Sequence, residues 1–187
     1  MLYSVRHTMN DTSLCLTLQI TTFLYFCFTL KAVTVKDIKE ELNLRSPKEL
    51  RELCLRLSRF KKENKELLTY ILFESSDEVS YIESVKRELD EQFEKINKES
   101  YSYIKKSIRK ILRITRKYIR YSLKKQTEVD LLIYFCLKLK NFSPSIQKNK
   151  GLLNLYNRQI DAIMKKVSTL HEDLQFDYGT ELKSFTE

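Results

Sequence analysis

A run of basic residues is the feature of this sequence with the clearest chemical meaning. Between Ile104 and Lys125 there is no Asp or Glu, and ten positions are Lys or Arg. At about 100° per residue on a helix, all of them except Lys125 fall within an arc of roughly 140°. These nine residues, here called the basic face, are Lys105, Lys106, Arg109, Lys110, Arg113, Arg116, Lys117, Arg120 and Lys124. Ile108 and Ile111 fall on the opposite arc, so the run predicts a helix with one cationic and one apolar side.

The basic face would bind anions. A row of Lys and Arg along one side of a helix neutralises successive phosphates of a nucleic acid and releases their counterions. Tyr101, Tyr103 and Tyr121 flank the row, and their rings would be able to stack on bases. No helix-turn-helix, zinc-finger or RNP pattern accompanies the row. The expected partner is therefore an acidic one, either nucleic acid or an acidic protein surface.

A second interpretation of the basic face is a solvated surface that is partly neutralised within the protein. The preceding segment, residues 77–99, holds eight acids and four bases, which is a net charge of 4 − 8 = −4. Short links make neighbouring helices antiparallel, so this segment would lie beside the basic helix. Ion pairs between the two helices would then use up part of the basic face, although each exposed pair contributes little energy. The surface potential of the folded chain would decide between the two interpretations.

The residues needed for enzymatic or metal chemistry are missing. Two glycines in the whole chain are too few for a phosphate-binding loop or a dinucleotide-binding turn. The four cysteines have no C-x-x-C spacing, and the two histidines, His7 and His171, are far apart, which is unlike a zinc site. Ser168 and His171 would lie on one polar helix side without an oxyanion site. We therefore expect a non-enzymatic protein with no cofactor, no metal site and no catalytic residue, in which Cys54 and Cys136 are small core residues.

The scarcity of Gly and Pro, two of each, predicts a few long helices joined by short links. Apolar spacing by threes and fours predicts six or seven of them. The expected ranges are 35–42, 46–60, 67–73, 77–96, 101–125, 127–140 and 152–174. The helix that Thr127 would cap is apolar on every side, so we expect it to be buried at the centre. The predicted fold is an all-α antiparallel bundle, with a short α-solenoid of helical hairpins as the alternative.

Residues 1–32 differ in composition from the remainder. No charged residue occurs from Ser13 to Leu30, although threonines dilute the apolar character. Three interpretations are open: an upstream extension translated ahead of a true start at Val33, a membrane anchor, or a signal peptide or buried element. Lys31 follows the apolar stretch, so an anchor would leave the domain in the cytoplasm, on the inner membrane. We expect residues 33–187 to form a single all-helical domain.

From Val33 to its end, the chain resembles a family of small uncharacterised proteins of Bacteroidetes bacteria, classed as a domain of unknown function. Five segments carry the resemblance: Val35–Leu42 (VKDIKEEL), Cys54–Glu74 (CLRLSRFKKENKELLTYILFE), Tyr81–Phe93 (YIESVKRELDEQF), Tyr103–Ser122 (YIKKSIRKILRITRKYIRYS) and Ser168–Leu174 (STLHEDL). It extends along the length of the chain and includes no short diagnostic motif. Members begin near the position of Val33, with Met in its place. The resemblance implies a bacterial cytoplasmic protein and no particular activity.

Three functional hypotheses follow from the sequence. The leading one is an interaction protein that uses the basic face to meet nucleic acid or an acidic protein. The second is a structural or assembly module that uses an apolar groove and has no anion site. The third is a membrane-anchored helical domain in the cytoplasm, which requires residues 13–30 to be a true anchor.

Overall fold

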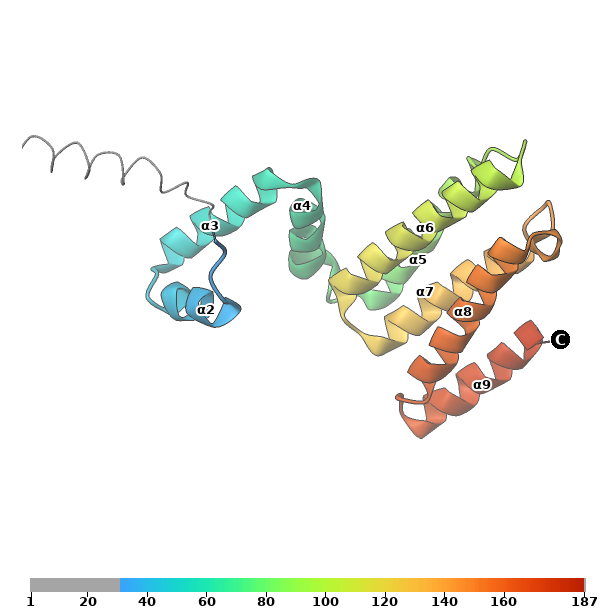
Figure 1. Ribbon diagram of the computed structural model, residues 1–187. Coiled ribbons are helices and arrows are strands. Elements are labelled where there is room, and N and C mark those ends of the chain that lie inside the picture. Colours follow the sequence, from blue (N-terminus) through green and yellow to red (C-terminus); the bar gives the residue numbers. More distant parts are fainter. Residues whose placement is uncertain (1–30, 187) are drawn as a thin grey trace, which may run out of the picture. The chain divides into compact units, whose positions relative to one another are not determined.

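The computed structural model describes residues 31–186, which contain eight α-helices and no strand (Figure 1). The expected all-α class is confirmed, with more helices than the six or seven predicted. The elements are α2 (Val35–Asn43), α3 (Pro47–Phe60), α4 (Lys62–Thr69), the π-helical segment η1 (Tyr70–Glu74), α5 (Glu78–Glu94), α6 (Tyr101–Ser122), α7 (Lys125–Lys140), the 3-10 turn η2 (Ile146–Lys148), α8 (Lys150–Val167) and α9 (Glu172–Thr186). The chain divides into two units, Met1–Leu53 and Cys54–Glu187, with the boundary inside α3.

The helix starts in the first unit are set by local hydrogen bonds. The Thr34 hydroxyl accepts from the Asp37 backbone N–H at 3.3 Å, and the Asp37 carboxylate accepts from the Thr34 N–H at 3.1 Å. Ser46 and Glu49 exchange the same two bonds, at 3.4 and 2.8 Å. Each pair forms a capping box, which satisfies backbone donors that a helix start leaves free. The predicted starts of the helices over residues 35–42 and 46–60 are therefore confirmed to within one residue.

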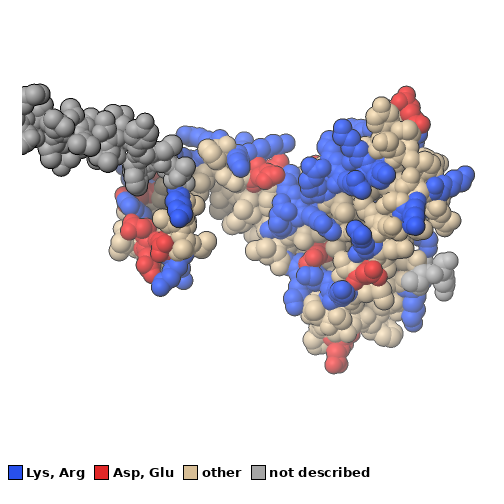
Figure 2. Space-filling model, viewed as in Figure 1, with Lys and Arg blue, Asp and Glu red and all other residues tan. Residues whose placement is uncertain are grey.

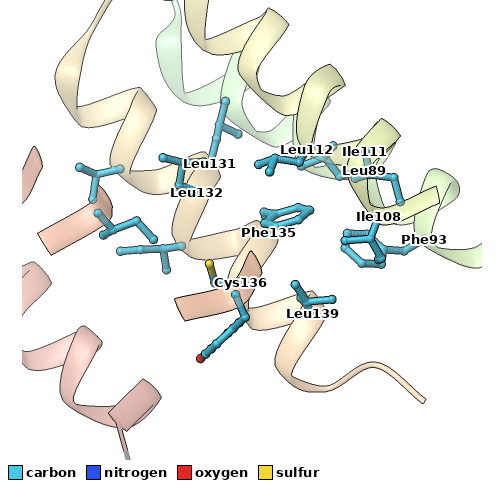
Figure 3. Packing of buried hydrophobic residues seen from close by; sticks show 14 of the residues in the cluster. Leu89, Phe93, Ile108, Ile111, Leu112, Leu131, Leu132, Phe135, Cys136 and Leu139 are labelled. Carbon is cyan, nitrogen blue, oxygen red and sulfur yellow. The ribbon is translucent and has the colours of Figure 1, made fainter. Parts of the chain in front are cut away.

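The second unit is a bundle arranged around α7. This helix packs against α5, α6 and α8, and its residues Phe135, Cys136 and Leu139 are fully buried. Leu89 and Phe93 of α5 and Ile108, Ile111 and Leu112 of α6 pack beside Phe135 (Figure 3). The predicted central position of this helix is confirmed. Consecutive helices α5 to α8 run antiparallel, so α6 and α8 run in the same direction on neighbouring sides of α7 (Figure 1).

The C-terminal helix differs from the prediction. A single helix was expected over residues 152–174, but α8 ends at Val167 and a separate helix, α9, follows and contains Gly179. The hydroxyls of Ser168 and Thr169 donate to the carbonyls of Lys165 and Lys166 at 2.9 and 2.8 Å, which favours a turn over a further helical step. The turn allows α9 to pack on α8 and to bury Tyr178, Leu182 and Phe185.

Two expectations about single residues are also wrong. Thr127 lies inside the first turn of α7, where it is buried, and Lys124 occupies the cap position instead. Cys136 lies in the core, where burial raises the pKa of its thiol to about 12, but Cys54 is exposed on α3. No side chain of α3 is buried, so this helix contributes no core position for Cys54.

The predicted membrane anchor and upstream extension concern a segment that the structure leaves almost wholly undescribed, since only Lys31 and Ala32 of residues 1–32 are described. Among residues 31–186, none of the helices combines the length and the apolar composition that crossing a bilayer requires.

Candidate polyanion-binding face

All nine residues of the basic face lie on α6 or directly after it, on the side away from the core. Ser100 caps the helix start through its hydroxyl, and Ile104, Ile108 and Ile111 bury the opposite side against the bundle. Lys105 and Lys117 are half-buried, and the other seven residues are exposed or partly exposed. Figure 2 shows Lys and Arg gathered over α6 on the side that faces the viewer. The amphipathic helix predicted from the spacing is therefore present.

The acidic helix α5 leaves most of the basic face uncovered. Glu78 pairs with Lys124, with the carboxylate oxygen 2.8 Å from the ammonium nitrogen. The other α5 carboxylates that form ion pairs do so within α5, with its C-cap Lys95 or with α7, as Asp90 does with Lys138 at 2.7 Å. Glu88 accepts a hydrogen bond from the Tyr118 hydroxyl. Of the nine basic-face residues, only Lys124 forms an ion pair with α5.

One further residue of the basic face is neutralised, by helix α4. Glu66 accepts from the Lys117 ammonium at 2.6 Å. The remaining seven residues form no ion pair with any residue between 31 and 186. These seven are Lys105, Lys106, Arg109, Lys110, Arg113, Arg116 and Arg120. Ion pairing among the described residues therefore neutralises two of the nine residues and leaves those in the middle of α6 without an acidic partner.

A groove of about 450 Å³ runs between α6 and α8 beside the basic face. Arg109 and Arg116 line it from α6, and Arg158 and Asn154 line it from α8. The Arg116 guanidinium donates to the side-chain carbonyl of Gln159 at 2.9 Å. Since Gln159 is 4% exposed, this bond holds Arg116 in a defined orientation. Three guanidinium groups, each a planar fork of N–H donors, suit the oxygens of a phosphate.

Gly151 at the start of α8 brings the two helices close at one end of this groove. A Cβ atom at Gly151 would lie 3.4 Å from Cδ of Lys105 and 3.5 Å from its Nζ. Both distances correspond to ordinary van der Waals contact, so the Lys105 side chain lies directly beside the start of α8. Arg158, Asn154 and Gly151 were missed by sequence analysis, because nothing in the chain indicates which side of α8 meets α6.

The partly buried carboxylate of Glu78 fixes the C-terminal end of α6. Glu78 accepts from the hydroxyls of Tyr70 at 2.9 Å and Thr127 at 2.6 Å, and also from the hydroxyl of Ser122 and the ammonium of Lys124. Burial by itself raises the pKa of Glu78, but the hydrogen bonds from these four partners lower it to about 2. The carboxylate therefore stays ionised and joins η1, α5, α6 and α7.

Two of the three flanking tyrosines are not free to stack on bases. Tyr121 is 8% exposed and its hydroxyl donates to Glu66 at 3.0 Å, so the stacking role expected for it is wrong. Tyr101 is half-buried, and its hydroxyl donates to the Ser145 carbonyl at 3.1 Å. Tyr103 is 54% exposed and makes no side-chain hydrogen bond with residues 31–186. Ring stacking is thus available at one position near the start of α6.

The residues considered for catalysis do not form a site. Ser168 donates to a backbone carbonyl, while His171 lies in the link between α8 and α9, with Nδ1 3.3 Å from an Asp173 carboxylate oxygen. They were expected on one helix, but the chain turns between them. Within residues 31–186, no three His, Cys, Asp or Glu residues are grouped so that they would hold a metal ion.

Comparison with known proteins gives no relative. No family model, no curated protein and no solved structure matches the chain.

Proposed function

We propose that this protein binds nucleic acid through the basic face of α6 and the arginine-lined groove beside it. The observation that carries the proposal is the row of seven basic side chains that form no ion pair with the described residues, although an acidic helix packs next to them. A row of cations that the protein leaves unneutralised is available to an external polyanion. The groove adds Arg158, which extends the row from one helix to two.

The geometry of the row favours the phosphate backbone as its target. A helix of 22 residues is about 33 Å long, which corresponds to about ten base pairs of duplex. The exposed side of α6 is almost entirely cationic, and no helix-turn-helix or other base-reading pattern accompanies it. Contacts from its cationic side would therefore reach phosphates, which position a protein and carry no sequence information directly.

The first expected result concerns sequence preference. We expect the full chain to bind labelled duplexes of about 15 base pairs at roughly 50 mM salt, with affinities for unrelated sequences that agree within about twofold. Fluorescence anisotropy with two duplexes of different base composition measures this. Heparin should compete, while polyglutamate of the same length should compete less, because carboxylates are spaced unlike phosphates. Absence of binding at this salt concentration would exclude the proposal, and stronger competition by polyglutamate would favour an acidic protein partner.

A second function, self-association, is favoured by exposed apolar side chains in η1. Ile71, Leu72 and Phe73 are consecutive and 53%, 61% and 75% exposed. Large apolar side chains exposed in a contiguous group mark interaction surfaces more often than isolated ones do. We therefore propose that two copies of the chain associate through this segment.

Sedimentation velocity tests the self-association. The wild-type chain is expected to show a concentration-dependent shift toward a dimer, and the variant with Leu72→Glu and Phe73→Glu is expected to remain a monomer. Leu123→Glu, which changes an 84% exposed leucine outside η1, serves as the matched control. A wild-type chain that is monomeric at high concentration would rule this second function out, and so would dissociation by the control alone.

A further inference from the structure

A cavity of about 240 Å³ lies among α4, η1, α5 and α6, and none of the functions above uses it. Four tyrosines and three glutamates make up most of its lining: Tyr70, Tyr81, Tyr118, Tyr121, Glu66, Glu74 and Glu88. The rings form two close pairs. The centroids of Tyr70 and Tyr81 are 4.6 Å apart, and those of Tyr118 and Tyr121 are 5.9 Å apart in an edge-to-face arrangement.

The hydroxyl groups of these tyrosines are all bonded to the protein. Tyr70 donates to Glu78, Tyr118 to Glu88 and Tyr121 to Glu66, and the Tyr81 hydroxyl donates to the backbone carbonyl of Tyr118. The lining therefore offers a ligand two kinds of group, aromatic rings and carboxylate oxygens. Ring faces carry partial negative charge, so both kinds attract cations and repel anions.

The ammonium group of Lys117 already lies among tyrosine rings and a carboxylate of this lining. The Lys117 nitrogen is 4.6 Å from the ring centroid of Tyr118 and 5.9 Å from that of Tyr121, and it pairs with Glu66. Glu66 is thereby neutralised. Glu74 and Glu88 form no ion pair with any residue between 31 and 186. The lining thus keeps two carboxylates whose charge has no partner among the described residues.

The position of Glu74 depends on the π-helical segment. Tyr70 and Glu74 are its first and last residues, and both line the cavity, while the three residues between them are exposed. Short π-helical turns are rare and occur often at functional sites. A neighbouring cation is Arg87, whose guanidinium donates to the hydroxyl of Ser84 in the lining at 3.1 Å.

We propose that this cavity binds a primary alkylammonium group, with the ammonium at Glu74 and Glu88 and the alkyl chain against the tyrosine rings. A primary ammonium has three N–H donors for carboxylate oxygens, whereas a quaternary ammonium has none. The volume is below the roughly 300–1,000 Å³ of sites for drug-sized ligands, which limits the occupant to a small amine or a single lysine side chain. A small free amine and a lysine side chain both present a primary ammonium group on an alkyl chain.

Titration of the full chain with n-butylamine at neutral pH, followed by NMR, tests the site. Saturable chemical-shift changes are expected at residues around the cavity, and 1-butanol, which has the same alkyl chain without the charge, is expected to cause none. Parallel titrations with 1,4-diaminobutane and with Nα-acetyl-lysine amide distinguish a free amine from a lysine side chain. Equal effects of butylamine and 1-butanol, or tighter binding of tetramethylammonium than of butylamine, would overturn the proposal.

Variants locate the site. Glu74→Gln is expected to weaken butylammonium binding about fivefold, and its combination with Glu88→Gln more than tenfold. Glu74 forms no ion pair with residues 31–186, and the amide oxygen in Glu88→Gln still accepts from Tyr118, so both variants should fold. Glu94→Gln removes the same charge from an exposed position of α5 outside the lining and should bind as the wild type does. Unchanged binding by the double variant, with circular dichroism like that of the wild type, would overturn the proposal.

Discussion

Replacement of Arg109, Arg113, Arg116 and Arg120 by Gln is expected to weaken the binding of duplex DNA about a hundredfold at low salt. Each guanidinium that contacts a phosphate releases about one counterion, and the neutral amide does not. None of the four arginines is buried, and none forms an ion pair with the described residues. Arg and Gln have similar helix propensities, so the helical content should not change. Only the hydrogen bond between Arg116 and Gln159 is altered.

The salt dependence of binding gives the more specific result. For the wild type, the logarithm of the binding constant should fall linearly with the logarithm of the salt concentration. The slope is expected to become shallower by about 3.6 in the four-residue variant, which is about 0.9 for each phosphate that the variant no longer neutralises. Anisotropy titrations of both proteins at several salt concentrations measure the two slopes.

A variant with the same change in charge controls for net charge. Lys48, Arg51, Arg56 and Arg59 are exposed on α3, and none has an ion-pair or side-chain hydrogen-bond partner among residues 31–186. Their replacement by Gln lowers the net charge by the same four units. This control should keep most of the affinity and a slope near that of the wild type. If both variants bind equally weakly, the binding depends on overall charge and α6 is not the site.

Glu78→Gln is expected to lower the free energy of unfolding by about 2–3 kcal/mol at pH 7. The carboxylate is largely buried, with 17% of the side chain exposed, and accepts from four donors on neighbouring elements. A neutral amide forms weaker bonds and leaves part of this donor set unsatisfied, in a partly desolvated place. Urea denaturation of both proteins measures the difference. Glu91→Gln, whose carboxylate pairs with Lys95 on the surface of α5, should change stability by less than about 0.5 kcal/mol.

Glu78 is expected to stabilise the fold less as the pH falls, because its pKa is lowered on folding. The pKa of Glu78 is lowered from about 4.5 to about 2 on folding, so the folded state favours the ionised form. Its contribution is therefore complete above about pH 4.5 and is lost as the pH falls through about 2. A shift of this size corresponds to about 3 kcal/mol. The difference in stability between the wild type and Glu78→Gln should shrink from pH 5 to pH 2, and a difference that stays constant would contradict the assignment.

Local patterns along the chain determined much of the secondary structure. Thr34, Ser46, Asp77 and Ser100 each begin a helix through a side chain that accepts a backbone N–H, and that signal needs only neighbouring residues. The cationic and apolar sides of α6 follow in the same way from a rotation of about 100° per residue. The central place of α7 follows from its apolar residues on every side, because such a helix is stable only when it is covered.

Predictions from local sequence patterns were wrong where contacts with residues distant in the sequence determine the structure. The spacing of apolar residues continues from Ile160 to Leu174, but the chain turns at Ser168, where local hydroxyl bonds favour the turn and the packing of α9 against α8 stabilises it. The side chain of Tyr121 was expected at the surface beside the basic face. It is buried because its hydroxyl reaches Glu66, which is 55 residues away in the sequence.

By itself the sequence determined an all-α fold, the helix that carries the basic face, and the nine residues of that face, because these depend on composition and helical period. Only the tertiary structure decided which of the nine have acidic partners. Ion pairs depend on which helices become neighbours and on the register between them. In α5, Asp90 pairs with Lys138 of α7, and Glu78 is the one α5 carboxylate that pairs with a described residue of the basic face. The arginine-lined groove and the tyrosine-lined cavity also arise only when helices meet.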